Sequence, residues 1–215
     1  MALNDRMIKT KENWAKFRRG GEEREVFEDS QDPRLPPGQH VVHNWPVLDI
    51  GCKPNLPLED WRLSVEGFVT SPIVWTWDQY LAEATCTSVS DFHCVTTWST
   101  FDNEWEGVSF KRLIEVVKPL SLATFVVFTA HDDYTTNLPL EACDDDDVLL
   151  AYKWNGKLLT KEHGAPVRMI IPKRYGWKGA KWVKAITFSD KDQKGFWEIR
   201  GYSNSALPWT NDRYA

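Results

Sequence analysis

The stretch Glu162–Lys184, EHGAPVRMIIPKRYGWKGAKWVK, carries a charge pattern unlike that of the rest of the chain. The positions from Pro166 to Lys184 include six basic residues and no acidic residue, although the whole chain has a net charge of −5. The basic residues are Arg168, Lys173, Arg174, Lys178, Lys181 and Lys184. Gly176 and Gly179 would let the backbone approach a ligand closely. Amides beside arginine and lysine bind phosphate well, so the segment predicts an anion site.

Two other interpretations fit the same segment. A solvated basic loop between two strands would show the same composition. Nucleic-acid binding would use the same charges, but no aromatic stacking motif accompanies them, and the chain is acidic overall. We therefore expect no nucleic-acid partner.

Hydrophobic runs around this segment predict a strand-rich fold. Strands are expected over 61–69, 89–95, 123–129, 148–152, 167–171 and 182–188. Thr76 and Gln79 form a capping-box pattern for a helix to about residue 84. Apolar residues from Phe110 to Val117 have helical spacing, and Pro119 ends that helix. Strands with segregated short helices favour an α+β domain with mixed or largely antiparallel sheets.

The first 40 residues differ from the rest of the chain. Residues 22–32 are rich in charge and lead into a proline-rich stretch, so we predict an N-terminal arm over 1–40 that drapes over a main domain at 41–215. The sequence contains no run of 18 apolar residues, so we predict no membrane span. Arg18 and Arg19 are not followed by a hydrophobic run, so we expect no export signal and a cytoplasmic protein.

One of the four cysteines, Cys94, is a candidate metal ligand because of its position. Cys94 lies at the end of an expected strand, in the segment DFHCVTTWS from Asp91 to Ser99. A thiolate is a suitable ligand for a thiophilic metal, and a coordinated thiol is deprotonated. The alternative is a small buried hydrophobe, which is what a cysteine at a strand end usually is. For Cys52, Cys86 and Cys143 we expect only buried or free thiols.

A polar loop is expected after the strand that ends at Thr129. It runs from Thr129 to Leu140, and a short helix is expected near Pro139. His131 and Tyr134 lie where this strand ends, which is a common place for functional groups. Taken singly, both are also typical surface hydrogen-bonding residues.

Read together and in order, these segments resemble the molybdenum domain of the sulfite oxidase fold family. This family includes sulfite oxidases, plant assimilatory nitrate reductases and the molybdenum subunit of bacterial methionine-sulfoxide reductases. The resemblance covers roughly residues 40 to 200. The segments that carry it are Cys94, then WEGV at 105–108 opening a helix, YTTNLPL at 134–140, LLAYKWNG at 149–156, and the block from His163 to Lys184.

The resemblance implies a single molybdopterin-binding domain and a set of site residues. Cys94 would be the protein ligand to molybdenum, and Tyr134 aligns with a tyrosine that faces the metal. Trp98 and Trp105 are candidates for the walls of the substrate pocket. The residues implied to contact the pterin or its phosphate are Asn44, Thr129, His163, Arg168, Gly179, Ala180 and Lys181.

The resemblance also implies two-electron oxygen-atom transfer on a small oxo-type substrate, which would be an S-oxide, an N-oxide or an oxyanion. Sulfite oxidases have an arginine pair soon after the cysteine, whereas this chain has VTTWS at 95–99, as methionine-sulfoxide reductases do. The family's haem domain and C-terminal dimerisation domain have no counterpart in the 215 residues, so we expect a monomer with a separate haem or flavin electron partner. The alternatives are a non-catalytic molybdopterin carrier, or a tryptophan-rich module for an oligosaccharide or a peptide.

Overall fold

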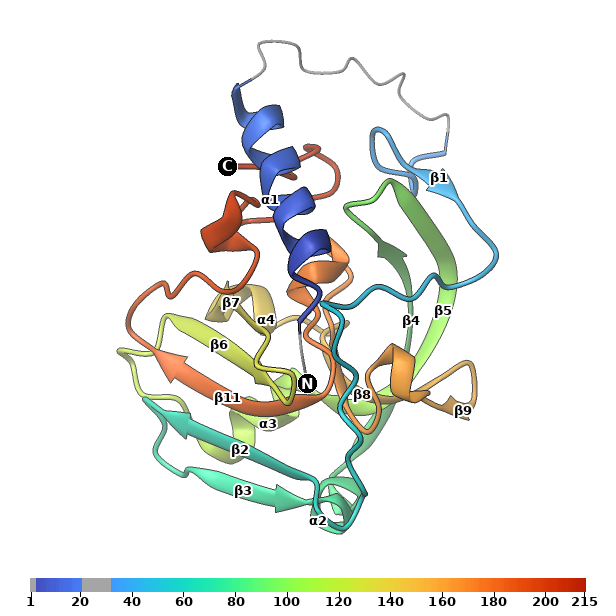
Figure 1. Ribbon diagram of the computed structural model, residues 1–215. Helices are drawn as coiled ribbons and strands as arrows, with labels where there is room; N and C mark the ends of the chain where they lie inside the picture. Colours follow the sequence, from blue (N-terminus) through green and yellow to red (C-terminus); the bar gives the residue numbers. More distant parts are fainter. Residues whose placement is uncertain (1–2, 21–31) are drawn as a thin grey trace.

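Two β-sheets make up most of the computed structural model, which describes residues 3–20 and 32–215 (Figure 1). The first sheet has the strand order β1 (His40–Val41), β5 (Trp98–Ser109), β8 (Leu149–Trp154), β10 (Arg168–Ile170), with β4 (Thr85–His93) beside β5 and β9 (Lys157–Leu158) beside β8. The second has the order β3 (Ile73–Thr76), β2 (Arg62–Gly67), β11 (Val183–Ser189), β6 (Phe125–Ala130), β7 (Thr135–Pro139). Only the β1–β5 and β2–β11 pairs are parallel among these strands. The expected α+β fold with mixed sheets is confirmed.

The helices among the described residues are mostly short. They are α1 (Asp5–Gly20), α2 (Trp77–Ala82), α3 (Phe110–Val117), α4 (Leu140–Cys143) and the 3-10 turns η1 (Lys161–His163), η2 (Gly176–Lys178) and η3 (Glu198–Arg200). The Thr76–Gln79 capping box is present at the start of α2. Helix α3 begins after its cap Ser109 and buries Phe110, Leu113 and Val117, as its spacing predicts.

Two expectations about local structure were wrong. The segment at 105–108 does not open a helix; it lies within β5, and α3 starts only at Phe110. Gly107 allows close strand pairing here, since a Cβ at this position would lie 2.0 Å from the Leu150 carbonyl oxygen. The expected polar loop after Thr129 is mostly strand β7, because Thr136 and Asn137 are fully buried and find polar partners in the C-terminal segment.

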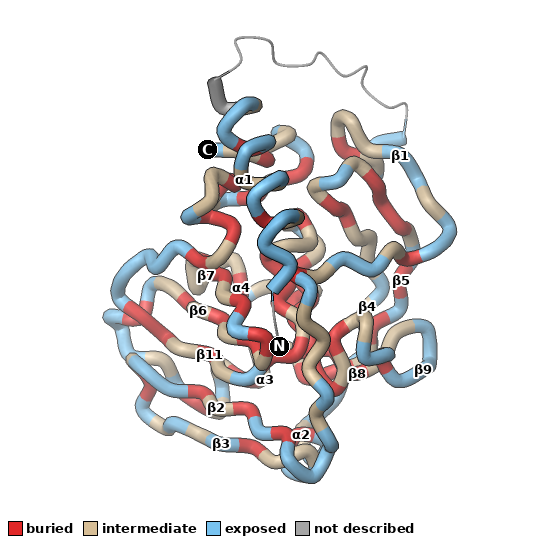
Figure 2. The backbone as a smooth tube through the Cα atoms, in the orientation of Figure 1, coloured by how far each residue is buried: buried red, intermediate tan, exposed pale blue. Residues whose placement is uncertain are grey.

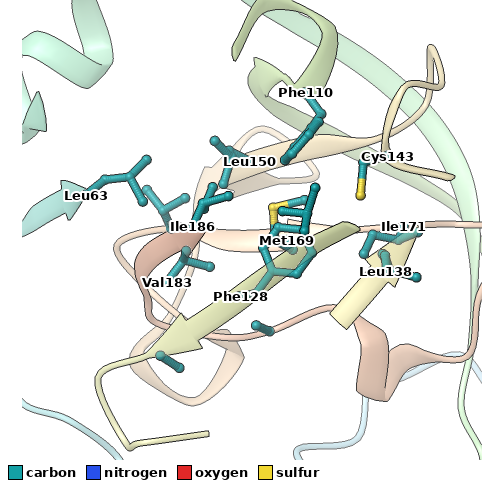
Figure 3. Close-up of a cluster of buried hydrophobic side chains, with 14 of the residues drawn as sticks. Leu63, Phe110, Phe128, Leu138, Cys143, Leu150, Met169, Ile171, Val183 and Ile186 are labelled. Atoms are coloured by element: carbon teal, nitrogen blue, oxygen red, sulfur yellow. The ribbon is translucent and has the colours of Figure 1, made fainter. Parts of the chain in front are cut away.

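The main core lies between the two sheets and α3 (Figure 3). Met169 of β10, Phe128 of β6, Ile186 of β11 and Phe110 of α3 are fully buried there. Each such side chain contributes about 1.5–3 kcal/mol on leaving water. Strands β10 and β11, which precede and follow the loop of the basic segment, therefore anchor the two sheets to each other and hold that loop in place.

The N-terminal segment contains a 16-residue helix, α1, that the sequence analysis does not predict. Its Ile8 and Ala15 belong to the main core, while most of its outer surface is exposed (Figure 2). The Asn4 amide donates to the Ile50 carbonyl at 2.9 Å, which ties the start of the helix to the segment after β1. Most of the charge-rich stretch at 22–32 lies outside the described residues. No helix in the described part is long and apolar enough to cross a membrane.

Candidate cofactor and active site

A cavity that opens to solvent brings together segments that are far apart in the sequence. Cys94 lies in its wall together with His163, Arg168, Gly179 and Lys181. We refer to this cavity as the Cys94 pocket. Cys94 and the basic segment, which the family resemblance assigns to one cofactor, thus share a pocket.

Cys94 occupies a tight turn between β4 and β5. Its amide donates to the Trp98 carbonyl at 2.9 Å, and its carbonyl accepts from the Thr97 amide at 3.0 Å. The Sγ atom lies 3.1 Å from Thr96 Oγ1. Burial raises the pKa of the thiol, against the opposing effects of Thr96, Lys11 and Arg213. A metal bound by Cys94 would have to displace the proton of the thiol, because a cysteine that coordinates a metal is deprotonated.

A C-terminal arginine holds the turn that carries Cys94. Nη1 of Arg213 donates to the Val95 carbonyl at 2.7 Å, and Nη2 lies 3.4 Å from the carbonyls of Pro37 and Gly38. The Gln39 side-chain amide donates to the Cys94 carbonyl at 3.1 Å. The chain end and the segment before β1 therefore position the thiol, which no local sequence pattern indicates.

The basic side of the pocket is built on Arg168 and Lys181. Arg168 is 3% exposed and donates to the carbonyls of His163 at 3.0 Å and Gly179 at 3.4 Å, but its Nε has no hydrogen-bond partner among the described residues. Burial lowers the pKa of Arg168 to about 9. Burial, and then the charge of Arg168, lower the pKa of Lys181 to about 7. A buried arginine beside a lysine whose pKa it lowers favours the binding of an anion between the two cations.

Trp45 forms an aromatic wall that the sequence analysis missed. Its ring stacks on His163 with 4.1 Å between centroids, and the Arg168 guanidinium lies 4.9 Å from the centre of the same ring. His163 Nε2 is 3.1 Å from the Trp45 carbonyl oxygen. The preceding residue, Asn44, is exposed and is not among the lining residues. The resemblance pointed to Asn44, one residue before the tryptophan that lines the pocket.

The two glycines of the basic segment make room for protein neighbours. A Cβ on Gly176 would lie 2.4 Å from the Phe92 ring, and one on Gly179 would lie 2.7 Å from the Met169 carbonyl oxygen. The expected role in close approach to a ligand is thus replaced by close packing of the loop on β10 and on Phe92. Gly179 still lines the pocket, whereas Ala180 is buried and its carbonyl accepts from the Met169 amide.

The basic residues of the segment separate into different roles. Lys178 is fully buried, forms an ion pair of 2.7 Å with Glu198 and is not a lining residue. Lys173 pairs with Asp145, and Lys184 is exposed. Only Arg168 and Lys181 of the six line the pocket. Part of the charge that predicted an anion site therefore serves the fold.

The segment after β6 contributes to the pocket only in part. Tyr134 lines it, but its hydroxyl donates to the Trp177 carbonyl at 2.5 Å. Thr129 pairs within the second sheet and is not a lining residue, and neither is His131. Trp98 does line the pocket, whereas Trp105 is fully buried behind it. The positions of Thr129, His131 and Tyr134 follow from the hairpin β6–β7, which the sequence analysis did not expect.

Asp132 is a pocket residue that the sequence analysis passed over. It is 7% exposed, and its Oδ1 accepts from the Tyr134 amide at 3.2 Å. Burial raises its pKa from 3.8 to about 6. The folded chain thus binds more protons here than the unfolded chain between about pH 4 and pH 6, so ionised Asp132 destabilises the fold above that range.

We expect Asp132→Asn to stabilise the cofactor-free protein by on the order of 2 kcal/mol at pH 7.5, since the amide keeps the hydrogen bond to Tyr134 without the buried charge. The gain should shrink toward zero as the pH falls to 4. Urea unfolding at pH 7.5, 6 and 4.5 measures it, with exposed Asp133→Asn as the matched control. A gain that is the same at every pH would contradict this assignment.

These observations agree with the demands of a molybdenum–pterin cofactor. One pocket holds a thiol that can become a soft metal ligand, a buried arginine with an unpaired nitrogen, and a lysine whose pKa is depressed beside it. A phosphate group would satisfy both cations. Such a fold and site define a cofactor-dependent oxidoreductase.

Comparisons with known proteins identify the family. Residues 51–197 match the family described as the oxidoreductase molybdopterin binding domain, and the chain belongs to this family. The expected cofactor class and the sulfite oxidase-like resemblance are confirmed. The chain is 39% identical over 188 residues to an uncharacterized oxidoreductase, YuiH, of Bacillus subtilis strain 168. The matched region covers 87% of this chain and 95% of that protein.

More distant relatives are longer proteins. The catalytic subunit MsrP of a protein-methionine-sulfoxide reductase from Campylobacter jejuni is 29% identical, over 67% of this chain and 54% of its own length. An NADH nitrate reductase of Volvox carteri is 28% identical, over 80% of this chain and 23% of its own length. The sulfane dehydrogenase SoxCD of Paracoccus pantotrophus has the same fold, with a TM-score of 0.62 at 24% identity, over 67% of this chain and 42% of that chain.

Proposed function

We propose that this molybdopterin-dependent oxidoreductase binds molybdenum through Cys94 and transfers an oxygen atom to or from a small oxo-type substrate in a two-electron reaction. The supporting observation is the pocket that Cys94 shares with Arg168 and Lys181, although Cys94 precedes both of them by more than 70 residues of sequence. The bound cofactor would supply the redox chemistry, and the protein supplies binding, orientation and electrostatics.

The residues on the basic side would hold the cofactor. Arg168 and Lys181 provide positive charge for a phosphate, and each is already fixed by a backbone carbonyl, so little side-chain freedom is lost on binding. The stacked Trp45 and His163 provide a flat aromatic surface beside them. The contact with the Trp45 carbonyl keeps His163 in place. Burial lowers the pKa of His163, against the opposing effect of that contact.

The residues on the thiol side would shape the reaction site. Trp98 and Trp177 line the pocket and limit the access of water. Tyr134 holds Trp177 through its hydroxyl, so in this geometry its proton is engaged with the protein. Tyr134 therefore acts here as a support for the pocket wall, and a direct role toward substrate requires that this hydrogen bond open.

Electrons would come from or go to a separate partner, a haem or flavin protein. We also propose that the protein is a monomer, which size-exclusion chromatography with light scattering would test. We propose a cytoplasmic location, which cell fractionation would test. The longer relatives act on methionine sulfoxide or nitrate by their names, and either kind of substrate fits oxygen-atom transfer.

The experiment that tests this proposal is elemental and pterin analysis of protein made in a molybdate-supplied host, followed by electron paramagnetic resonance and turnover with a reduced dye. We expect about one molybdenum and one pterin per chain, a Mo(V) signal, and dye oxidation with an S-oxide or an oxyanion. Bound pterin without any turnover would favour the carrier alternative. Absence of both molybdenum and pterin would reject the proposal.

A further inference from the structure

Lys11 of helix α1 is a pocket residue that neither the resemblance nor the family match includes. Asn4, Ile8, Lys11 and Ala15 follow one another at steps of four, three and four residues, so they lie on one face of the helix. Ile8 and Ala15 are buried in the core, and Lys11 stands between them where an apolar residue would be expected. The inward face of α1 therefore points a lysine into the Cys94 pocket.

The helix is held against two walls of this pocket. Its start is tied to Ile50, which lines the pocket, by the hydrogen bond from Asn4. Further along, the Lys11 ammonium lies 5.4 Å from the centre of the Trp197 ring, another lining residue. In Figure 1, α1 (blue) lies between the segment after β1 and the C-terminal segment (red). The position of Lys11 is thus set by the fold.

Lys11 has no charged partner in direct contact. Among the described residues, no carboxylate lies within 4.0 Å of its ammonium, and no hydrogen bond to the ammonium is present. Its main electrostatic neighbours are the Cys94 thiol and the carboxylate of Asp49, and burial lowers its pKa. Asp49 is itself engaged with Lys53 at 3.7 Å and with the Gly51 amide at 2.8 Å. A partly buried cation without a partner, facing a cavity, is suited to bind an anion that enters from solution.

This charge is separate from the cations assigned to the cofactor. Both lysines interact electrostatically with Asp49, but Lys181 also interacts with Arg168 and Asp132, whereas Lys11 interacts with Cys94. The turn after Cys94, VTTWS, carries no basic residue. Among the described residues, α1 thus supplies a positive charge to the thiol side of the pocket that the turn itself does not contain.

We propose that Lys11 is a specificity-determining residue, which binds the negative charge of an anionic oxo substrate beside the Cys94 thiol, and that α1 forms the substrate-facing wall of the active site. This inference rests on the proposed function, because it assigns the thiol side of the pocket to substrate. It predicts a preference for oxyanions over neutral S-oxides. It also gives the N-terminal helix a direct part in substrate selection.

The test compares Lys11→Met with Lys9→Met, which removes the same charge from an exposed position on the same helix. Sulfate serves as a non-reducible probe, and its binding to the cofactor-loaded protein is measured by isothermal titration calorimetry. We expect Lys11→Met to weaken sulfate binding by about tenfold or more, as for a lost charge-assisted contact. Lys9→Met should bind sulfate as the unmodified chain does, and Lys11→Arg should keep most of the affinity.

Steady-state kinetics give a second readout on the same proteins. For nitrate, Lys11→Met should raise KM at least as strongly as it weakens sulfate binding and change kcat less. For neutral dimethyl sulfoxide, KM should stay within about twofold. Equal sulfate binding by Lys11→Met and the unmodified chain, or no sulfate binding to either, would overturn the inference while leaving the proposed function intact. Lack of molybdenum in the unmodified chain would instead reject the proposed function.

Discussion

Cys94→Ser should abolish turnover while the protein still folds and keeps its pterin. The hydroxyl is a hard ligand in place of a soft thiolate, so the metal would lose its protein ligand of suitable chemistry. We expect kcat to fall by about three orders of magnitude or more, equivalent to about 4 kcal/mol of lost transition-state stabilisation. Pterin content should be near that of the unmodified protein, because the basic side of the pocket is unchanged.

The matched control is Cys86→Ser, which changes an exposed cysteine on β4, the strand that leads to Cys94. Its turnover and Mo(V) signal should equal those of the unmodified protein. Thermal unfolding of both variants checks the fold, and the expected shifts are small since serine replaces cysteine with little change in volume. Activity in Cys94→Ser similar to that of Cys86→Ser would show that the thiol is not the metal ligand.

Arg168→Ala should lose the cofactor. Its guanidinium is buried, aimed into the pocket and short of one hydrogen-bond partner, so it is the group on the basic side that gains most from an anion. We expect binding weaker by on the order of 2 kcal/mol, or about 30-fold, from the lost charge-assisted contact. The stability of the cofactor-free protein should change less, because relief of the buried charge opposes the loss of the contacts with His163 and Gly179.

Two further variants give this prediction its controls. Arg168→Lys keeps the charge but cannot reproduce the forked contacts, so it should retain an intermediate amount of pterin. Lys184→Ala removes an exposed charge from the same basic segment and should leave pterin content unchanged. Pterin and molybdenum are measured after purification and again after dialysis. Undiminished occupancy in Arg168→Ala would place the phosphate elsewhere in the pocket.

Much of the fold is predictable because its signals are local. The capping box at Thr76, the helical spacing from Phe110 and the apolar runs on both sides of the basic segment each describe a few consecutive residues, and the structure agrees with them. One of the failures occurs where burial overrides local polarity. Thr136 and Asn137 have a polar sequence, but they form a buried strand because side chains of the C-terminal segment satisfy them.

The site shows the same division. Sequence pattern and family resemblance bring Cys94, His163, Arg168 and Lys181 forward, and the structure places them around one pocket. Sequence pattern and resemblance do not indicate Trp45, Asp132 or Lys11, because no motif or local pattern distinguishes these residues from their neighbours in sequence. Asn44, Thr129 and Ala180 show the converse, since they match the family pattern but do not line the pocket.

By itself, the sequence determined the α+β class, the family and the chemical types of the main site residues, because periodicity, capping and motif order are properties of neighbouring positions. Only the tertiary structure decided which charges face the pocket and which are neutralised elsewhere. Lys178 and Lys181 are three positions apart in the basic segment. Lys178 forms a buried ion pair with Glu198, whereas Lys181 lines the pocket. A charge acts through its distance to other charges and through its burial, and both are settled by residues remote in the chain.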